Sequence, residues 1–310
     1  MLGDVPVALG LQEPPDKDQQ APDKDKAMPI AHLADRAVVT VTGPDARAFL
    51  HNVVTCNVNT LKEGGARYGA LLMPQGKIIS DFLIYAPKAQ PDTFLLDAPR
   101  TVAPDLVKRL TMYRLRSKVE VALEDARAVV AVWGEEVAPA GSEAFEDPRL
   151  EDLGLRCVMF ASDAQALGGD PDAYAAHRIA LGIPQGGADF VYGDAFPHEA
   201  DMDQLGGVDF KKGCYIGQEV VSRTQHRGIA RTRAVEALFT SAPEEGAEIR
   251  AGEKTVGRMG SSAAASGRGI ALVRLDRVAD AKASGLPLVA GGVELALKVP
   301  DWASFEMGDA

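Results

Sequence analysis

The sequence predicts an α+β protein that ends in an all-β module, and three observations support this fold class. Helical and strand-like patterns alternate over the first two thirds of the chain, whereas short apolar runs separated by Gly, Pro and Ser follow Val235. The 310 residues are too many for one core, so we expect two or three domains and favour three. A hydrophobic fraction of 46% with 25% charged residues excludes a disordered, collagenous or fibrous protein.

The expected elements follow one another along the chain. A β-branched run at 38–41 predicts a strand, and the apolar spacing at 45–54 predicts a helix. Two apolar runs flank the turn residues Pro74-Gln75-Gly76-Lys77 and predict a hairpin of strands at 68–73 and 78–85. The next patterns predict a strand, a helix and two strands at 93–96, 103–112, 118–123 and 127–133.

The middle of the chain is richer in turn residues. The Pro-, Gly- and acid-rich segment 138–148 predicts a loop, and residues 155–161 predict a strand. Pro171 opens a predicted helix at 171–181, and a further helix or strand begins at Gln218. Residues 12–26 contain almost no apolar side chain, so we expect a disordered tail over 1–27.

Charge and cysteine content limit the class of function. With 44 acidic and 33 basic side chains the net charge is -11, which disfavours nucleic acid as a partner. No apolar stretch approaches the roughly 20 residues of a membrane helix, so we expect no membrane partner. Three scattered cysteines fit a reducing compartment, and without a recognisable signal peptide they predict a cytoplasmic location.

A basic segment at 204–233 is the strongest candidate site. Six basic side chains stand there against two acidic ones, a net charge of about +4 in an acidic chain. Cys214 follows Lys212 by two residues, and a nearby ammonium favours the thiolate, the form that acts as nucleophile or metal ligand. The alternative is a buried cysteine that only packs, which is the reading we favour for Cys56 and Cys157.

Other cofactor motifs find little support. No two cysteines form a CxxC pair, so any iron–sulfur cluster would be shared with a partner. The five histidines form no HExxH motif, and the chain contains neither GxxxxGK[ST] nor a complete GxGxxG. We therefore expect no zinc site and no nucleotide-binding loop.

The segment Lys212 to Glu219, KGCYIGQE, resembles the KGCYxGQE signature of the YgfZ family of folate-binding iron–sulfur assembly factors. Residues 219–228 resemble the downstream segment of the mitochondrial members. The run 43–46, the run 68–72 and residues 178–186 (RIALGIPQG) are similar to the folate-binding region shared with glycine-cleavage aminomethyltransferase.

This resemblance implies a three-domain ring of the aminomethyltransferase folate-binding type, with a C-terminal β-barrel module, around a channel that holds tetrahydrofolate. The implied domains are a discontinuous folate-binding domain of residues 28–88 and 182–233, a second α+β domain at 89–181 and the barrel at 234–310. The implied partners are folate and iron–sulfur carrier or client proteins.

The resemblance also implies roles for particular residues. Cys214 would be the reactive residue, acting in thiol exchange or as a ligand of a cluster shared with a partner. Arg223 and Arg227 would lie near the glutamate tail of folate, because guanidiniums form charge-assisted bonds with carboxylates. The expected folate-binding set is Tyr68, Asp81, Arg178, Lys212, Gly217, Gln218, Glu219, Arg223 and Arg227.

Two departures from the aminomethyltransferase pattern bear on catalysis. Ser80-Asp81 stands where those enzymes carry paired aspartates, the first of them catalytic, and Ala180 stands where many relatives carry a folate-contacting Glu. The sequence therefore favours an accessory protein for the assembly or repair of iron–sulfur proteins over an enzyme. The alternatives are tetrahydrofolate-dependent aminomethyl transfer and a folate store without chemistry.

Overall fold

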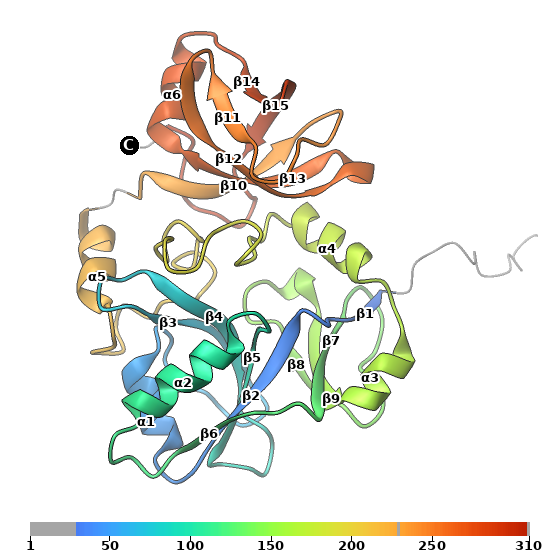
Figure 1. The fold of residues 1–310 in the computed structure, drawn as a ribbon, viewed down its shortest axis with the longest axis vertical. Coiled ribbons are helices and arrows are strands. Elements are labelled where there is room, and N and C mark those ends of the chain that lie inside the picture. Colours follow the sequence, from blue (N-terminus) through green and yellow to red (C-terminus); the bar gives the residue numbers. More distant parts are fainter. Residues whose placement is uncertain (1–28, 228–229, 309–310) are drawn as a thin grey trace, which may run out of the picture.

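The computed structural model describes residues 29–227 and 230–308, so the tail expected at 1–27 lies outside the described residues. Two antiparallel sheets form the lower half of the molecule and a closed β-barrel forms the upper half (Figure 1). The long connection 182–217 runs between the two halves. None of the described helices is long and apolar enough to cross a bilayer.

The first sheet has five strands in the order β3-β4-β5-β2-β6. These are β2 (Arg36–Thr42), β3 (Ala66–Leu72), β4 (Ile78–Tyr85), β5 (Thr93–Pro99) and β6 (Glu120–Leu123). Helices α1 (Ala46–Val53) and α2 (Ala103–Tyr113) cover one face, against which Ala37, Val39 and Val41 pack. Val38 points to the opposite face because side chains alternate along a strand. The predicted hairpin of β3 and β4 is confirmed.

The second sheet has four strands in the order β1-β7-β9-β8. These are β1 (Ile30–His32), β7 (Arg127–Val132), β8 (Glu143–Glu146) and β9 (Leu155–Phe160). A short 3₁₀ turn (Glu151–Leu153), α3 (Ala161–Leu167) and α4 (Pro171–Ala180) complete this region. The two sheets share one core, in which the Tyr85 and Phe145 rings stack with centroids 4.2 Å apart.

Two expectations about this region need correction. The segment 138–148 is not all loop, because β8 pairs with β9 as an edge strand and buries Phe145 while Ala144 and Glu146 stay exposed. Strand pairing also crosses the expected domain boundary between residues 88 and 89. Strands β5 and β6 pair with β2, and β1 pairs with β7, so each sheet takes strands from both sides of that boundary.

The C-terminal β-barrel is confirmed as a closed six-stranded barrel in the order β10-β13-β12-β11-β14-β15. Its strands are β10 (Thr232–Leu238), β11 (Glu248–Ala251), β12 (Lys254–Ala263), β13 (Arg268–Arg274), β14 (Leu288–Ala290) and β15 (Val293–Lys298). A 3₁₀ turn (Ala264–Ser266) precedes β13. The module is not purely β, because α6 (Leu275–Ala283) packs Leu275, Val278 and Ala281 into the barrel core.

Two buried ionic clusters join the barrel to the rest of the molecule. Arg178 of α4 donates to Asp189 Oδ2 at 2.9 Å and to Ser261 Oγ of β12 at 2.8 Å. Arg233 of β10 donates to Asp203 Oδ1 at 2.6 Å and to Asp201 Oδ1 at 3.2 Å. Both arginines are buried, as are Asp189 and Asp201, so these clusters fix the barrel against the connection 182–217.

Candidate functional site

A polar pocket of about 210 Å³ lies between the first sheet and α4. Tyr68 of β3, Asp81 of β4 and Arg36 of β2 line it, because all three lie on the sheet face turned toward the second sheet. Asp81 opposes Ala70 in the hairpin, so Tyr68, two residues before Ala70 in β3, is its diagonal neighbour. The predicted site residues Tyr68 and Asp81 are thus brought together.

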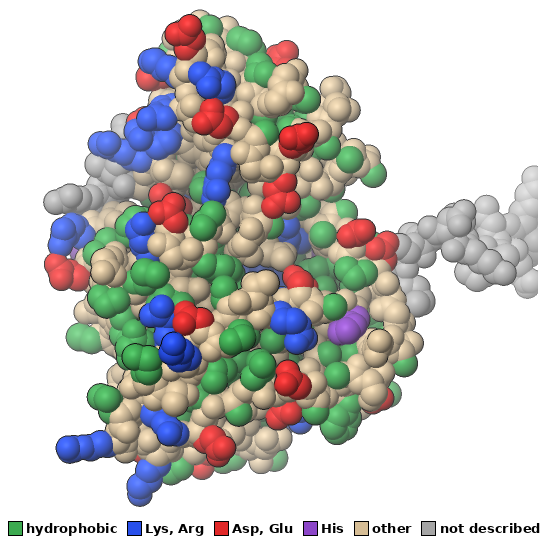
Figure 2. All heavy atoms as spheres, viewed as in Figure 1, with side chains coloured by type: hydrophobic (Ala, Val, Ile, Leu, Met, Phe, Trp, Pro, Cys, Tyr) green, Lys and Arg blue, Asp and Glu red, His purple; other side chains and the backbone are tan. Residues whose placement is uncertain are grey.

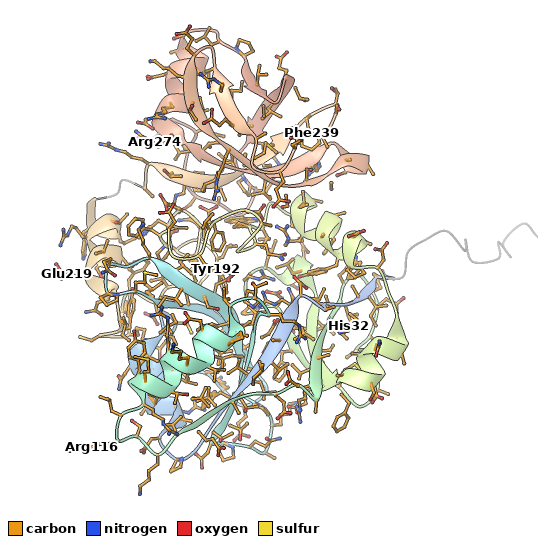
Figure 3. All side chains as sticks on the ribbon, viewed as in Figure 1. His32, Arg116, Tyr192, Glu219, Phe239 and Arg274 are labelled. Atoms are coloured by element: carbon orange, nitrogen blue, oxygen red, sulfur yellow. The ribbon has the colours of Figure 1, made fainter. Side chains whose placement is uncertain are left out.

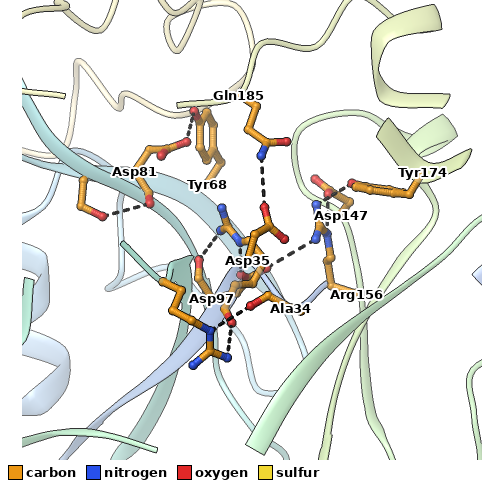
Figure 4. A network of polar contacts seen from close by, with 12 residues as sticks. Ala34, Asp35, Tyr68, Asp81, Asp97, Asp147, Arg156, Tyr174 and Gln185 are labelled. Atoms are coloured by element: carbon orange, nitrogen blue, oxygen red, sulfur yellow. Dashed lines mark hydrogen bonds and ion pairs between the residues drawn. The ribbon is translucent and has the colours of Figure 1, made fainter. Parts of the chain in front are cut away.

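The Asp81 carboxylate is held at both oxygens. Tyr68 Oη donates to Oδ2 at 3.0 Å (Figure 4), and Tyr192 Oη donates to Oδ1. Burial and, as the second cause, the Asp81 charge raise the pKa of each phenol well above its usual value. Both hydroxyls therefore remain protonated donors. Sequence reasoning missed Tyr192, which lies in the connection 182–217 (Figure 3) and belongs to no regular element.

Three guanidiniums, those of Arg36, Arg149 and Arg156, also line the pocket. Asp97 accepts from Arg36 Nε at 2.5 Å. Asp147 accepts two bonds from the Arg149 guanidinium, at 3.0 and 2.7 Å, and one from Arg156 Nε at 3.3 Å. Burial alone would raise the pKa of Asp147, but Arg149 and Arg156 hold it at about 2. The pocket wall is therefore a fixed array of paired charges.

Part of this array lacks hydrogen-bond partners among the described residues. Asp97 Oδ2 and Arg156 Nη1 lie 3.7 Å apart, too far for a hydrogen bond, and both atoms are buried. The buried hydroxyl of Tyr85 also lacks a hydrogen-bond partner among the described residues. Buried polar groups of this kind are normally satisfied by a ligand or by ordered water.

The expected folate contact Arg178 lies elsewhere, as do the two residues that depart from the aminomethyltransferase pattern, Ser80 and Ala180. Ser80 opposes Leu71, which packs in the helix-covered core, so Asp81 is the residue of this pair that faces the pocket. Arg178 belongs to the barrel junction, and Ala180 lies exposed at the end of α4. Neither residue lines the pocket.

The KGCYIGQE segment forms a loop that packs against the turn of the β3–β4 hairpin. Gly213 and Gly217 adopt positive φ of 98° and 81°. A Cβ on Gly217 would lie 2.5 Å from the carbonyl oxygen of Met73, so only glycine fits this approach. The Tyr215 amide donates to Gln218 Oε1 at 3.0 Å, where α5 (Gln218–Arg227) begins.

Lys212 fastens this loop to the carboxyl end of α1. Its Nζ donates to the Val54 carbonyl at 2.5 Å and to the His51 carbonyl, and its own carbonyl lies 3.2 Å from His51 Nε2. A cation suits this end of a helix dipole. Burial lowers the pKa of Lys212 to about 8. The ammonium is thus directed to α1, and the described hydrogen bonds and ion pairs include none from it to Cys214.

The three cysteines differ in exposure. Cys214 is exposed, whereas Cys56 and Cys157 are buried in two separate cores, as expected. Burial raises the pKa of Cys56 to about 12, which keeps it a thiol. Within the described ranges no group of three or more His, Cys, Asp or Glu side chains could hold a metal ion.

The basic segment does not form one continuous cationic surface. Arg233 is buried in ion pairs, and Arg223 pairs with Glu219 at 2.7 Å on the exposed side of α5 (Figure 3). The side chain of Arg227 lies outside the described residues. Cys214 does not line the pocket of Tyr68 and Asp81, so the candidate residues form two sites.

Comparisons with known proteins agree with this architecture. Residues 29–153 match the family model "GCVT N-terminal domain", and residues 220–305 match "CAF17, C-terminal beta-barrel domain". Glycine cleavage system aminomethyltransferase T from Bartonella henselae superposes with a TM-score of 0.69 at 17% identity, covering 88% of this chain and 86% of that one. At that identity the likeness shows the fold alone, and it confirms the aminomethyltransferase type.

Curated relatives are more similar in sequence. The "Iron-sulfur cluster assembly factor IBA57 homolog, mitochondrial" of Pyricularia oryzae is 33% identical over 292 residues, or 83% of this chain and 75% of the relative. The protein of the same name from Neurospora crassa is 34% identical over 68% of this chain, and the match spans about half of that relative, 53%. Both are named as mitochondrial, so they give no support to the cytoplasmic location expected above.

Proposed function

Because the chain belongs to the IBA57 family of iron–sulfur cluster assembly factors, we propose that it supports the assembly or repair of iron–sulfur proteins with Cys214 as its reactive residue. This family, whose bacterial counterpart is YgfZ, lies within the aminomethyltransferase superfamily, which confirms the resemblance found in the sequence. The one-carbon-transfer alternative depends on the fold, which by itself does not determine function.

The exposure of Cys214 carries the proposal. Thiolates are the usual protein ligands of iron–sulfur clusters, and the thiol of Cys214 is open to a partner while Cys56 and Cys157 are enclosed in cores. Gly217 and Lys212 brace the loop on the hairpin turn and on α1, so the thiol is presented from a rigid support. We infer that Cys214 supplies one ligand of a cluster and that a carrier protein supplies the others.

A cluster-transfer complex tests this role. The protein is mixed anaerobically with a cluster-loaded A-type carrier, and the visible absorbance of the isolated complex is recorded. Cys214→Ala should lower the cluster absorbance, whereas the control Cys157→Ala, which changes a buried thiol, should leave it unchanged. Equal absorbance for Cys214→Ala and wild type would exclude the ligand role and leave thiol exchange as the chemistry of Cys214.

We further propose that the pocket binds the pterin end of tetrahydrofolate. The residues present fit such a ring, because Asp81 is an acceptor for ring N–H groups and the buried Arg156 Nη1 is a donor without a partner among the described residues. A volume of about 210 Å³ is below the roughly 300 Å³ at which sites for whole drug-sized ligands begin, so the pocket suits the ring rather than the entire molecule.

In this proposal the residues of the chain bind and orient the ring, whereas the one-carbon chemistry would be supplied by tetrahydrofolate, which carries one-carbon units. Tyr68 and Tyr192 fix the Asp81 carboxylate, and the paired guanidiniums fix the pocket wall, so little rearrangement accompanies binding. Both phenols remain protonated and keep Asp81 a directed acceptor.

Anaerobic calorimetry with tetrahydrofolate tests the pocket. Asp81→Asn, which keeps the size of the side chain but removes its charge, should weaken binding at least about tenfold, the equivalent of about 1.4 kcal/mol. Cys214→Ala should bind as wild type does, because Cys214 does not line the pocket. Absence of binding by the wild type, or equal binding by Asp81→Asn, would overturn the proposal.

The expected role of α5 toward the glutamate tail needs its own test. Arg223 is exposed on α5, where its partner is Glu219. The double variant Arg223→Ala, Arg227→Ala should bind polyglutamylated folate more weakly than wild type and monoglutamate equally well. Unchanged affinity for the polyglutamate would remove these arginines from the folate site.

A further inference from the structure

The carboxyl end of α2 and the turn that follows expose two large apolar side chains. Leu115 is 87% exposed, the highest value among the exposed large hydrophobic residues that the structure describes, and Met112 is 62% exposed. Isolated exposed apolar residues are common, but these two lie three residues apart at one corner of the molecule. Met is enriched at protein–protein interfaces, and adjacent exposed apolar side chains mark a candidate interaction site.

Leu115 is also held in an unfavourable backbone conformation. Its φ is 46°, in the left-handed region, which costs a non-glycine residue roughly 1 kcal/mol. The surrounding turn enforces it, because the Ser117 amide donates to the Arg114 carbonyl at 2.7 Å and Arg114 Nη1 donates to the Val119 carbonyl at 2.8 Å. A strained residue that is exposed rather than packed points to a role outside the fold.

The charge around this pair is opposite to that of the chain. Residues 108–118 contain five basic side chains and no acidic one, whereas the whole chain carries -11. Arg109 pairs with Asp105 at 2.6 Å, so four basic side chains give the corner its excess of positive charge. Figure 3 shows Arg116 at the lower left corner, extending away from the fold, and Figure 2 shows Lys and Arg side chains gathered at that corner. The corner therefore complements an acidic surface.

The corner and the Cys214 loop lie at opposite ends of one helix. The Lys118 amide donates to Asp45 Oδ2 at 2.7 Å where α1 begins, and Lys212 Nζ donates to the Val54 carbonyl where α1 ends. Eight residues of helix span about 12 Å. A single partner can therefore cover the corner and still reach the thiol.

We propose that residues 108–118, with Met112 and Leu115 as anchors, form the docking surface for the partner that shares a cluster with Cys214, and that this partner presents an acidic face with an apolar recess. The inference rests on the proposed function. A protein fits better than an anionic lipid surface, because the occupant must also supply the remaining ligands of the cluster at the exposed Cys214.

The test uses the A-type carrier without its cluster, so that docking is measured apart from ligation. Leu115→Asn removes the anchor but keeps a residue that tolerates positive φ, and Arg116→Glu reverses the exposed charge. The matched controls are Val137→Asn, at another exposed apolar residue, and Lys282→Glu on α6. Urea unfolding checks that all four variants are as stable as wild type.

Each corner variant should raise the dissociation constant for the carrier at least about tenfold, and each control less than about twofold. The wild-type affinity should also fall as salt is added. If both corner variants bind the carrier as tightly as wild type does, the docking surface is overturned. It is also overturned if the corner variants lose binding to phosphatidylserine vesicles while their affinity for the carrier is unchanged. A wild-type protein that does not bind the carrier would instead refute the proposed function on which the surface depends.

Discussion

The packing of Gly217 against the hairpin turn makes a quantitative prediction for Gly217→Ala. The new Cβ would lie 2.5 Å from Met73 O, closer than real contacts allow, and 3.0 Å from Leu72 Cβ, which is a tight contact. The positive φ of 81° costs an alanine about 1 kcal/mol, and displacing a packed backbone adds about 1 to 3 kcal/mol. We expect the free energy of unfolding to fall by about 2 to 4 kcal/mol.

Gly213→Ala is the matched control for this change. Gly213 has a φ of 98° in the same loop, but a Cβ there would meet no atom within 4 Å. It should therefore lose only the backbone contribution, about 1 kcal/mol. Urea unfolding of both variants measures the difference. Equal losses would show that the loop does not pack on the hairpin as described, and would remove the support that we assign to Cys214.

Three further predictions concern thiols, acid stability and the barrel junction. Under native conditions a maleimide should label Cys214 rapidly, and Cys56 and Cys157 only after unfolding; rapid labelling of three thiols would contradict their burial. The pKa of Asp147, about 2 in the folded protein against 3.8 normally, contributes about 2 kcal/mol of stability that is present above pH 4 and lost as pH falls toward 2. The difference in unfolding free energy between wild type and Asp147→Asn should therefore shrink over that range, and a constant difference would refute the assignment. Arg178→Met should cost about 3 kcal/mol by leaving Asp189 buried without its cation, and adding Asp189→Asn should recover part of that loss. Additive losses in a double-mutant cycle would show that the pair does not interact.

Elements with a strong local pattern could be predicted from the sequence. The hairpin of β3 and β4 has two apolar runs on either side of Pro-Gln-Gly-Lys, and α4 begins at Pro171 with Asp170 accepting from the Asp172 and Ala173 amides. Strand β8 has no such pattern. It has one buried side chain, Phe145, whose partner Tyr85 is distant in the chain, so its stability depends on tertiary contact.

The direction of side chains in the pocket follows the alternation along β4. Asp81 lies on the pocket face with Leu83 and Tyr85, and Ser80 lies on the helix-covered face. Asp81 could therefore be predicted as a pocket residue from the sequence. Tyr192, which donates to the same carboxylate, could not, because no local signal identifies it.

The sequence by itself determined the signature Lys212 to Glu219, the glycines at 213 and 217 and the alternation that builds the sheets and the barrel, because these depend on neighbours in the chain. Only the tertiary structure decided which charges are paired. Lys212 points to α1 and Arg233 into the barrel junction because their partners, Val54 and Asp203, come from distant segments. Electrostatic energies depend on distance and burial, and both are set only when those segments pack together.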